Sequence, residues 1–507
     1  MPEVRVVDFE GVSVEVLDRP AAGTPRCRLV FADFVTPDGL GVSAEARRAF
    51  DLFGFTADEG QLHPGVDEDG QPVLWVGLGL HRDLTGGDLG RSMAGVLRST
   101  RLPAIAVATS WMESAVGAQV AGCELTVGAI SGAYRFQPRA YDAPQPAARS
   151  ILLYGDDLAG VAQGVHRGFA IGRAQSLARD LVNEPANQMT PSRIAEVAEA
   201  VAARTGMGVT IWESGDIESS GLGGLLAVTA GSAQPPRFVT LRYHGTTDKP
   251  ASSKLPVIGL VGKGVTFDSG GLCLKAADPM ATMKIDMCGA AAVLGAMEAI
   301  STLGTDLPVT AYLPLAENMP GGKATRPGDI AKMANGLTVE IVNTDAEGRL
   351  LLADGLSVAV KEGVSALIDI ASLTGACRVS LGTAVGGVFG SDDAWVTSVL
   401  QGSAQASEQL WHLPMVDGYA TELHSLVADL RNVGRPVRPN EAGAIVAALF
   451  LRRFVSNVPW AHIDMGGPAY RAQASWFSEE GATGFGVRTL LETVARAGEY
   501  FRSTSDA

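Results

Sequence analysis

The sequence predicts an α/β protein of two domains, each a sheet flanked by helices, with a mainly parallel central sheet in the C-terminal domain. Three observations support this prediction. The chain has 507 residues, which is more than one hydrophobic core usually supports. Strand-like and helix-like segments alternate along it. Several strand-like segments of the second half are apolar throughout, as is typical of strands covered on both faces.

The first domain, expected at residues 1–160, has short β-rich segments separated by helical patterns. A helix is expected over Asp88–Arg98. Gly77 and Gly79 resemble the start of a dinucleotide-binding loop, but Arg82 replaces the third glycine, so no nucleotide site is predicted. The expected strands are Val4–Val7, Arg28–Phe31, Val73–Leu80, Ala104–Ala108, Glu124–Ala129 and Ser150–Leu153.

A connecting segment is expected at residues 161–190, because the long helical pattern Gly160–Val182 is broken by Asn183–Asn187. The second domain is expected at residues 191–507. Two prolines and mixed charges in Arg435–Glu441 indicate an exposed loop. The second set of expected elements comprises helices Ser192–Thr205, Gly289–Leu303 and Leu350–Glu362, and strands Val209–Trp212, Phe238–Tyr243, Pro256–Val261, Val309–Leu315 and Ala366–Ala371.

Composition excludes several classes of protein. Hydrophobic residues make up 46% of the chain, which is too many for a disordered protein. The 40 basic and 55 acidic residues give a net charge of -15, which repels a phosphate backbone and argues against nucleic acid as a partner. Five cysteines without CxxC spacing indicate reduced thiols. Without a signal segment or a run of about 18 apolar residues, the sequence predicts a cytoplasmic protein that does not bind membranes.

The octapeptide Asn343–Leu350 places Asp345, Glu347 and Arg349 directly after the strand-like run Leu337–Val342. We expect this run to belong to the parallel sheet, whose strand ends commonly carry chemistry in α/β proteins. Alternate residues of an extended segment point the same way, so all three charged side chains are expected to face one cavity. The alternative is a surface turn with an incidental ion pair.

A second charged cluster follows the expected strand Pro256–Val261. The glycine-rich run 262–271 contains Lys263 and Asp268, and Lys275 and Asp286 come after it. A phosphate-binding loop would open a helix with Lys followed by Ser or Thr, whereas this run places a carboxylate where phosphate would lie. Anion binding alone therefore does not explain the cluster.

The two clusters together predict a metal site. If Asp268, Asp286, Asp345 and Glu347 converge, their mutual repulsion requires neutralising cations, and two divalent ions would balance the charge. Oxygen-rich ligands suit Mg²⁺, Mn²⁺ or Zn²⁺. His462 alternates with apolar residues and is expected to be a hydrogen-bonded core histidine, not a ligand.

On these motifs the sequence resembles the leucyl aminopeptidase family, also called cytosol aminopeptidases. The family's signature octapeptide is complete at residues 343–350, and the runs 262–271 and 283–291 are also family hallmarks. The resemblance extends from about Arg179 to Leu490. It implies a divergent N-terminal α/β domain, a dimetal catalytic domain and a cytosolic homohexamer that acts on peptides.

The resemblance also implies a ligand set. One metal would be held by Asp268, Asp345 and Glu347, and the other by Lys263, Asp268, Asp286 and Glu347, with Mn²⁺ or Zn²⁺ as the ions. Lys263 would have to be neutral to act as a ligand, far below its usual pKa of about 10.4.

By the same resemblance, a hydroxide held by both metals attacks the first peptide carbonyl and releases the N-terminal residue. Lys275 would donate to the developing oxyanion, and Arg349 would hold a bicarbonate that acts as general base. Leu and other apolar N-terminal residues are the expected preference. The pocket for the N-terminal side chain would be formed by Met283, Ser372, Leu373, Thr374 and Gly375.

Three alternatives remain open from the sequence. The same catalytic residues would serve a narrower dipeptidase, such as one that hydrolyses Cys-Gly. Some relatives add a DNA-binding accessory role, against which the acidic charge argues. A metal-dependent phosphohydrolase is the third. The loop Arg435–Glu441 is longer than the usual family connection.

Overall fold

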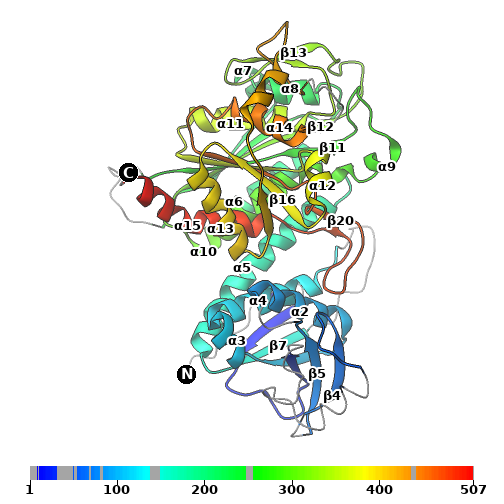
Figure 1. Cartoon of the computed structure of the whole chain (residues 1–507), viewed down its shortest axis with the longest axis vertical. Helices are drawn as coiled ribbons and strands as arrows, with labels where there is room; N and C mark the ends of the chain where they lie inside the picture. The colour runs from blue at the N-terminus through cyan, green and yellow to red at the C-terminus, as the bar shows by residue number, and fades with distance from the viewer. Residues whose placement is uncertain are drawn as a thin grey trace. The chain divides into compact units, whose positions relative to one another are not determined.

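The computed structural model describes residues 8–9, 11–30, 50, 54–67, 70–79, 84–136, 149–246, 255–434 and 441–505. The chain forms two compact units (Figure 1). Unit 1 comprises Met1–Ser176 and Ala472–Glu480, and unit 2 comprises Leu177–Arg471 and Gly481–Ala507. The predicted α/β class, with two domains whose sheets are flanked by helices, is confirmed. The predicted boundaries at residues 160 and 190 stay predictions.

Unit 1 contains a seven-stranded sheet in the order β1-β2-β7-β6-β3-β5-β4. Only β1–β2 and β4–β5 pair antiparallel, and the inner strands are parallel. Its helices are α2 (Gly86–Ser99), α3 (Ser110–Val116), α4 (Ala118–Ala133) and the start of α5 (Leu158–Asn183). The strands are Asp8–Phe9, Val12–Val16, Arg26–Val30, Leu62–Val66, Pro72–Gly77, Ala104–Ala108 and Arg149–Tyr154 for β1 to β7.

The strand predicted at Glu124–Ala129 is wrong, because these residues lie inside α4. All six are buried, so this stretch of helix has no polar face from which the helical period could be read. Gly128 allows α4 to approach α2 closely: a Cβ on Gly128 would lie 2.2 Å from the carbonyl oxygen of Gly90. The expected strand Val4–Val7 lies outside the described residues.

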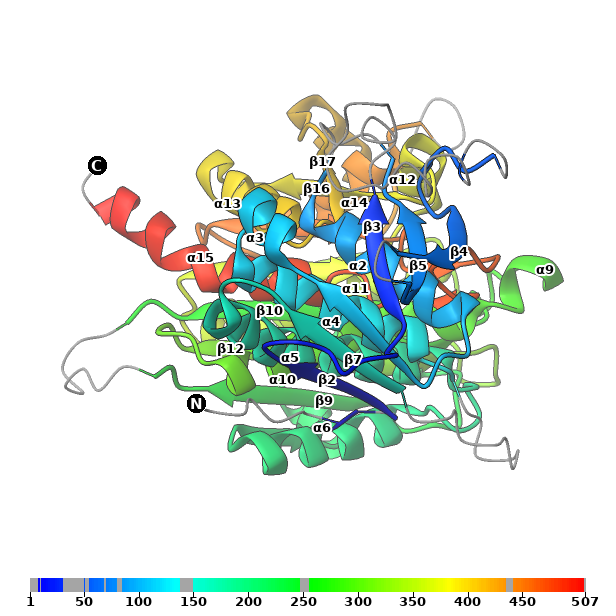
Figure 2. The ribbon, with the colours of Figure 1, turned by 90° about the horizontal axis from the view of Figure 1, so that it is seen from below.

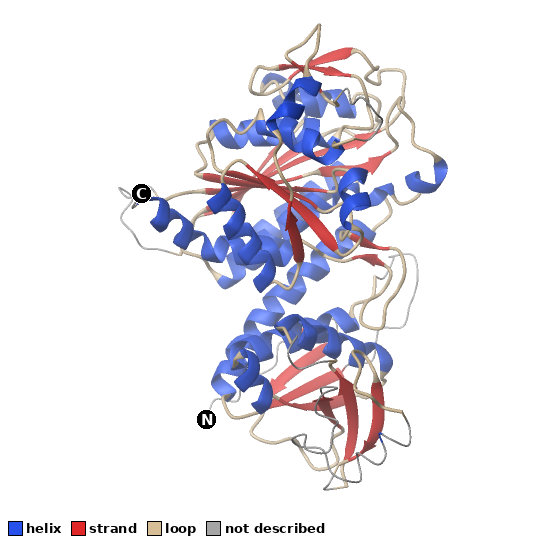
Figure 3. Ribbon diagram, in the orientation of Figure 1, coloured by secondary structure: helices blue, strands red, loops and turns tan. Residues whose placement is uncertain are grey.

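Unit 2 is built on a nine-stranded sheet with helices on both faces (Figure 3). Its path is β17-β16-β19-β15-β10-β12-β9-β8, and β11 pairs with β12. The central strands β10, β12, β15 and β19 run parallel, as predicted. The strands are Gly208–Trp212 (β8), Arg237–Tyr243 (β9), Ile258–Gly262 (β10), Gly264–Asp268 (β11), Val309–Asn318 (β12), Ala366–Ala371 (β15), Val385–Gly390 (β16), Gln409–His412 (β17) and Trp460–Asp464 (β19).

The core of unit 2 explains why its strands read as apolar runs. Every residue of β10, β15 and β19 is buried. Helix α10 (Cys288–Leu303) packs on β10 and β12 (Figure 2), and α11 (Gly348–Lys361) packs on the same two strands. The remaining helices of unit 2 include α6 (Pro191–Thr205), α7 (Ser214–Ser219), α8 (Gly223–Thr229), α12 (Gly375–Leu381), α13 (Asp393–Gln405), α14 (Gly443–Arg452) and α15 (Val487–Ser505).

One helical stretch of the described chain, Met283–Leu303, is long and apolar enough to cross a membrane. However, 89% of its most apolar window is buried inside the protein. This stretch therefore has the character of a core helix.

The prediction that the strand before the octapeptide belongs to the parallel sheet is wrong. That strand, β14 (Thr338–Ile341), belongs to a three-stranded sheet with β13 (Asp329–Lys332) and β18 (Leu430–Arg431), and not to the parallel central sheet. It pairs antiparallel with β13 and parallel with β18. Its alternating burial is that of a strand covered on one face only.

Candidate metal centre

Lys263 and Asp268 lie at the carboxyl ends of two strands. β10 ends immediately before Lys263, and β11 ends at Asp268. The backbone of Lys263 is fixed on both sides, because its N–H donates to the Ile370 carbonyl at 3.2 Å and its carbonyl accepts from the Ala290 N–H at 2.8 Å. Both side chains are buried.

The structure brings Asp268, Asp286 and Glu347 together. One ligand oxygen from each lies within 4.8 Å of the others, so the three could share a metal ion. Lys263 Nζ lies between two of these acids, 2.7 Å from Asp286 Oδ1 and 2.9 Å from Glu347 Oε1. The predicted convergence of the two charged clusters therefore occurs.

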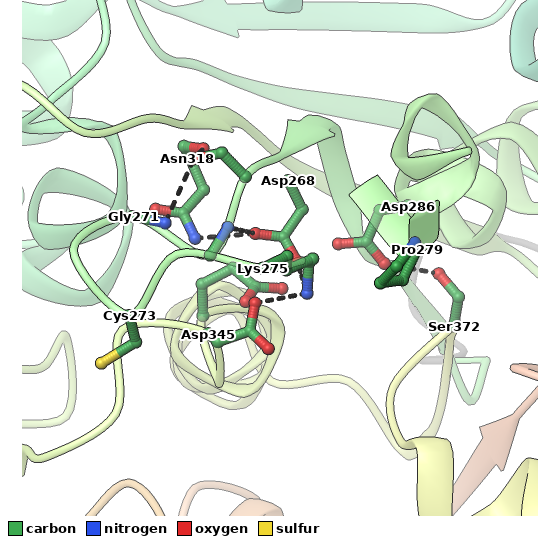
Figure 4. Close-up of polar contacts among 12 residues, drawn as sticks. Asp268, Gly271, Cys273, Lys275, Pro279, Asp286, Asn318, Asp345 and Ser372 are labelled. Atoms are coloured by element: carbon green, nitrogen blue, oxygen red, sulfur yellow. Dashed lines mark hydrogen bonds and ion pairs between the residues drawn. The ribbon is translucent and has the colours of Figure 1, made fainter. Parts of the chain in front are cut away.

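Asp345 joins this group through Lys275. Lys275 Nζ donates to Asp268 Oδ2 at 2.6 Å and also pairs with Asp345 Oδ1 (Figure 4). Two lysines thus face four carboxylates. The sequence predicts Lys275 near the site, and the structure shows that it bridges Asp268 and Asp345.

Burial and charge act in opposite directions on these groups. Burial, together with Glu347, raises the pKa of Asp268 to about 6. Burial also raises the pKa of Asp286 well above its usual value. Burial alone would lower the pKa of Lys263, but Asp286 and Glu347 outweigh it and the pKa is raised. The lysines are therefore the counter-charges of the acids.

Two buried oxygens of this cluster accept no hydrogen bond from the described residues, namely Asp286 Oδ2 and Glu347 Oε2. A buried acceptor without a donor is costly unless something else satisfies it. Asp268 differs, because its Oδ1 accepts from Gly270 N–H and from Asn318 Nδ2, each at 2.8 Å. Only Oδ2 of Asp268 is directed at the cluster. This donor set fits divalent cations.

The expected extended geometry of residues 345–349 is wrong. Asn343 Oδ1 accepts from the Asp345 N–H at 2.9 Å, which turns the chain. Glu347 already has helical angles, φ -77 and ψ -38, and Gly348 begins α11. Glycine at 348 leaves room for Lys263, because a Cβ there would lie 2.3 Å from Lys263 Cε and would push that side chain aside. The first turn of a helix, not strand alternation, therefore aims Glu347 at Lys263.

Arg349 is buried on the other side of this helix start. Its Nη1 donates to the Asn432 carbonyl at 2.8 Å, and its buried Nε has no acceptor among the described residues. Burial lowers its pKa to about 10, although Glu347 and Asp464 act in the opposite direction. The guanidinium therefore keeps a donor for an anion.

The segment predicted to line the side-chain pocket has well-defined polar contacts. Ser372 Oγ donates to Asp286 Oδ1 at 2.8 Å, so its hydroxyl supports an acid of the cluster (Figure 4). Thr374 Oγ1 donates to Asp464 Oδ2 at 2.6 Å, and the Leu373 N–H donates to Asp464 Oδ1 at 3.2 Å. Gly375 begins α12. The pocket role of these residues stays a prediction.

Met283, the remaining predicted pocket residue, lies in the 3-10 helix η3 (Met283–Met287), which also carries Asp286. Its pocket role also stays a prediction. The loop Arg435–Glu441 lies outside the described residues except for Glu441.

His462 is a core histidine, as expected. It lies in β19 and is buried, with Nδ1 2.6 Å from Asp369 Oδ1. Trp460 Nε1 donates to the other oxygen of Asp369 at 2.6 Å. The imidazole is thus held by Asp369 and belongs to no metal-ligand cluster among the described residues.

Sequence reasoning missed Asn318, Asn432 and Asp464. Asn318 ends β12, and its amide donates to Asp268 Oδ1 and to the Thr344 carbonyl. A polar amide that closes a buried apolar strand was the available signal. Asn432 lay in the segment 428–432, which resembles the family, and Asp464 lay at the end of an apolar strand-like run, but nothing in the sequence paired them with residues far away along the chain.

Residues 176–491 match the family model described as "Cytosol aminopeptidase family, catalytic domain". A "Probable cytosol aminopeptidase" of Syntrophotalea carbinolica is 39% identical over 459 residues, which cover 88% of this chain and 90% of that protein. One of Chlorobaculum tepidum is 44% identical over 381 residues, covering 73% and 74% of the two chains.

Solved structures of the bottromycin maturation enzyme BotP are also similar. Their sequence identity is 37% and the TM-score is 0.82, with 94% of this chain and 100% of BotP covered. One of these structures is described as a complex with Mn.

We predict that the His462–Asp369 pair stabilises the fold more at low pH than at high pH. Burial and the nearby charge of Arg349 lower the pKa of His462, but the charges of Asp369 and Asp464 outweigh them, so the pKa is raised. This contribution is fully present below the unfolded-state pKa of about 6.5 and is lost as the pH rises through the folded-state pKa.

Urea unfolding of wild-type protein and His462→Gln between pH 6 and pH 9, with chelator present throughout, measures this contribution. The difference in unfolding free energy should shrink as the pH rises. A constant difference would show that the pKa of His462 is not raised on folding.

Proposed function

The chain belongs to the cytosol aminopeptidase family and is a metal-dependent peptidase, and from this premise we propose that it releases N-terminal residues from peptides through a pair of bridged metal ions. Leucine and other mainly apolar residues are the proposed preference. The observation that carries the proposal is the buried group of Asp268, Asp286 and Glu347 with two carboxylate oxygens left without donors.

We propose Asp268, Asp345 and Glu347 as ligands of one ion and Lys263, Asp268, Asp286 and Glu347 as ligands of the other. The two oxygens of Glu347 support a bridging role, since Oε1 faces Lys263 and Oε2 has no donor. Asp268 would offer its Oδ2 to the ions, because Oδ1 already accepts two hydrogen bonds. Bound divalent ions would acidify water and polarise the scissile carbonyl.

The chain's own residues would divide the remaining work. Lys275 carries its ammonium at the edge of the cluster, where it can donate to the oxyanion that develops on the scissile carbonyl. Arg349, whose buried Nε has no acceptor among the described residues, would hold bicarbonate through parallel hydrogen bonds, and the bound anion would supply a general base. Met283 and the segment 372–375 would receive the N-terminal side chain.

Hydrolysis of Leu-p-nitroanilide tests the proposed function. Protein stripped with chelator should be inactive and should regain activity on reloading with Mn²⁺ or Zn²⁺, and Glu347→Gln should regain none. Comparing Leu-amide with Cys-Gly separates a broad aminopeptidase from a narrow dipeptidase. Cleavage of a phosphate ester without any peptide hydrolysis would refute the proposal.

Assembly as a cytoplasmic homohexamer is a further part of the proposal. Unit 2 exposes several large apolar side chains that assembly could cover, since Val379 is 88%, Trp411 64% and Leu426 80% exposed. Light scattering after size exclusion measures the mass in solution. A monomer at micromolar concentration would contradict this part of the proposal.

We predict that Lys263→Arg weakens one of the two metal positions. A guanidinium stays protonated and cannot offer a lone pair, whereas an amine can once it loses its proton. Metal analysis after dialysis should fall from about two ions per subunit to about one. An unchanged stoichiometry would remove Lys263 from the ligand set.

We predict that Arg349→Ala keeps both metals but loses at least about a hundredfold in kcat, as expected when a positioned proton acceptor is lost. Metal analysis and turnover of Leu-p-nitroanilide check the two halves of this expectation. Wild-type turnover without bicarbonate dependence in the variant would contradict the role of Arg349.

A further inference from the structure

Asn432 is fully buried and follows directly after β18. Its side-chain amide bonds to the main chain at the entry of the octapeptide as another strand residue would. Oδ1 accepts from the Val342 N–H at 2.9 Å and from the Asn343 N–H at 3.4 Å. Nδ2 donates to the Asn343 carbonyl at 2.6 Å and reaches the Ala346 carbonyl at 3.4 Å.

The main chain of Asn432 holds the other end of the octapeptide. Its carbonyl accepts from Arg349 Nη1 at 2.8 Å, and its N–H donates to the Glu340 carbonyl at 3.0 Å. One residue therefore binds the segment both before Asp345 and after Glu347. Since Nε of Arg349 has no acceptor among the described residues, this bond to Asn432 is the contact that orients the guanidinium.

We propose that Asn432 is a positioning residue that sets the guanidinium of Arg349 for its anion. The side-chain amide fixes the carbonyl of residue 432 against the octapeptide, and that carbonyl fixes Arg349. This inference rests on the proposed function, in which Arg349 holds the anion.

The chemistry of the site explains why residue 432 is asparagine. Only an amide offers a donor and an acceptor side by side, in the spacing of a peptide group. Aspartate could not donate to the Asn343 carbonyl and would place a negative charge near an anion site. Serine or alanine would leave half-buried peptide groups of residues 342 and 343 without these partners, which is unfavourable.

Asn318 offers a matched control. It is also buried, and its amide also holds the octapeptide, by donating to the Thr344 carbonyl at 3.0 Å. However, its other bond goes to Asp268 Oδ1 at 2.8 Å, and within the described part of the chain no hydrogen bond joins it to Arg349. Asn318 therefore lies on the metal side of the octapeptide, and Asn432 lies on the side of Arg349.

The test compares Asn432→Ala, Asn432→Ser and Asn318→Ala as manganese-loaded proteins. Three quantities are measured: bicarbonate binding by calorimetry, metal affinity by chelator competition, and the bicarbonate concentration that gives half-maximal kcat. Asn432→Ser carries a hydroxyl in place of the amide, and it replaces Asn432→Ala in these measurements if that variant does not fold.

The Asn432 variants should bind bicarbonate roughly tenfold more weakly, because about one hydrogen bond to the anion would be misplaced. Their metal affinity should be unchanged. Excess bicarbonate should restore most of their kcat, and KM for Leu-p-nitroanilide should change little. Asn318→Ala should show the converse, weaker metal binding with a near-normal bicarbonate constant.

Three results would overturn the inference. If the Asn432 variants bind bicarbonate with wild-type affinity, the position of the Arg349 guanidinium does not depend on the Asn432 side chain. An equal loss of metal and bicarbonate affinity would reveal a structural role only. If the wild-type protein hydrolyses peptides but binds no bicarbonate, there is no anion site for Asn432 to position, although the peptidase activity stands. Failure of the proposed function is a different result, because the protein would then hydrolyse no peptide at all.

Discussion

The repulsion among four clustered carboxylates, three of them buried, is the constraint on which the site depends. Asp268, Asp286 and Glu347 have ligand oxygens within 4.8 Å of one another, and the chain answers this charge with two lysines. Lys263 lies between Asp286 and Glu347, and Lys275 lies between Asp268 and Asp345. Removing Lys263 would leave a buried pair of like charges, which is unfavourable without cations, and removing Lys275 would leave buried Asp268 beside the half-buried Asp345.

The backbone around this pocket is shaped by the need to bring the charges close. A Cβ on residue 348 would lie 2.3 Å from Lys263 Cε, so a larger residue there would displace the lysine from its place beside Glu347. The start of α10 approaches the end of β10 at Gly289, where a Cβ would lie 2.8 Å from Lys263 N and 2.1 Å from the carbonyl oxygen of Ile370 in β15. Close packing of β10, α10 and α11 therefore sets the distances among the ligands, and a methyl group at either glycine would alter them.

The sequence predicted the parallel core and the residues of the charged pocket, because both depend on local patterns. Strands buried on both faces are apolar throughout, and Lys263 directly follows one of them, while Asp268 and Asp345 stand out as charges at the ends of strand-like runs. Glu124–Ala129 was misassigned because a helix buried on all sides loses its helical period. Asn318 and Asn432 were missed because their amides bond to main-chain groups that are 26 and 89 residues away, which no local pattern records.

The helical start of α11 separates the opposite charges of the octapeptide. In an extended segment Glu347 and Arg349 would share a face and could pair with each other. In a helix, residues two apart point to nearly opposite sides. Because α11 begins at Gly348, Glu347 turns to Lys263 while Arg349 turns to the carbonyl of Asn432. One helix start thus keeps an acid for cations and a guanidinium for an anion, although only Gly348 lies between them in sequence.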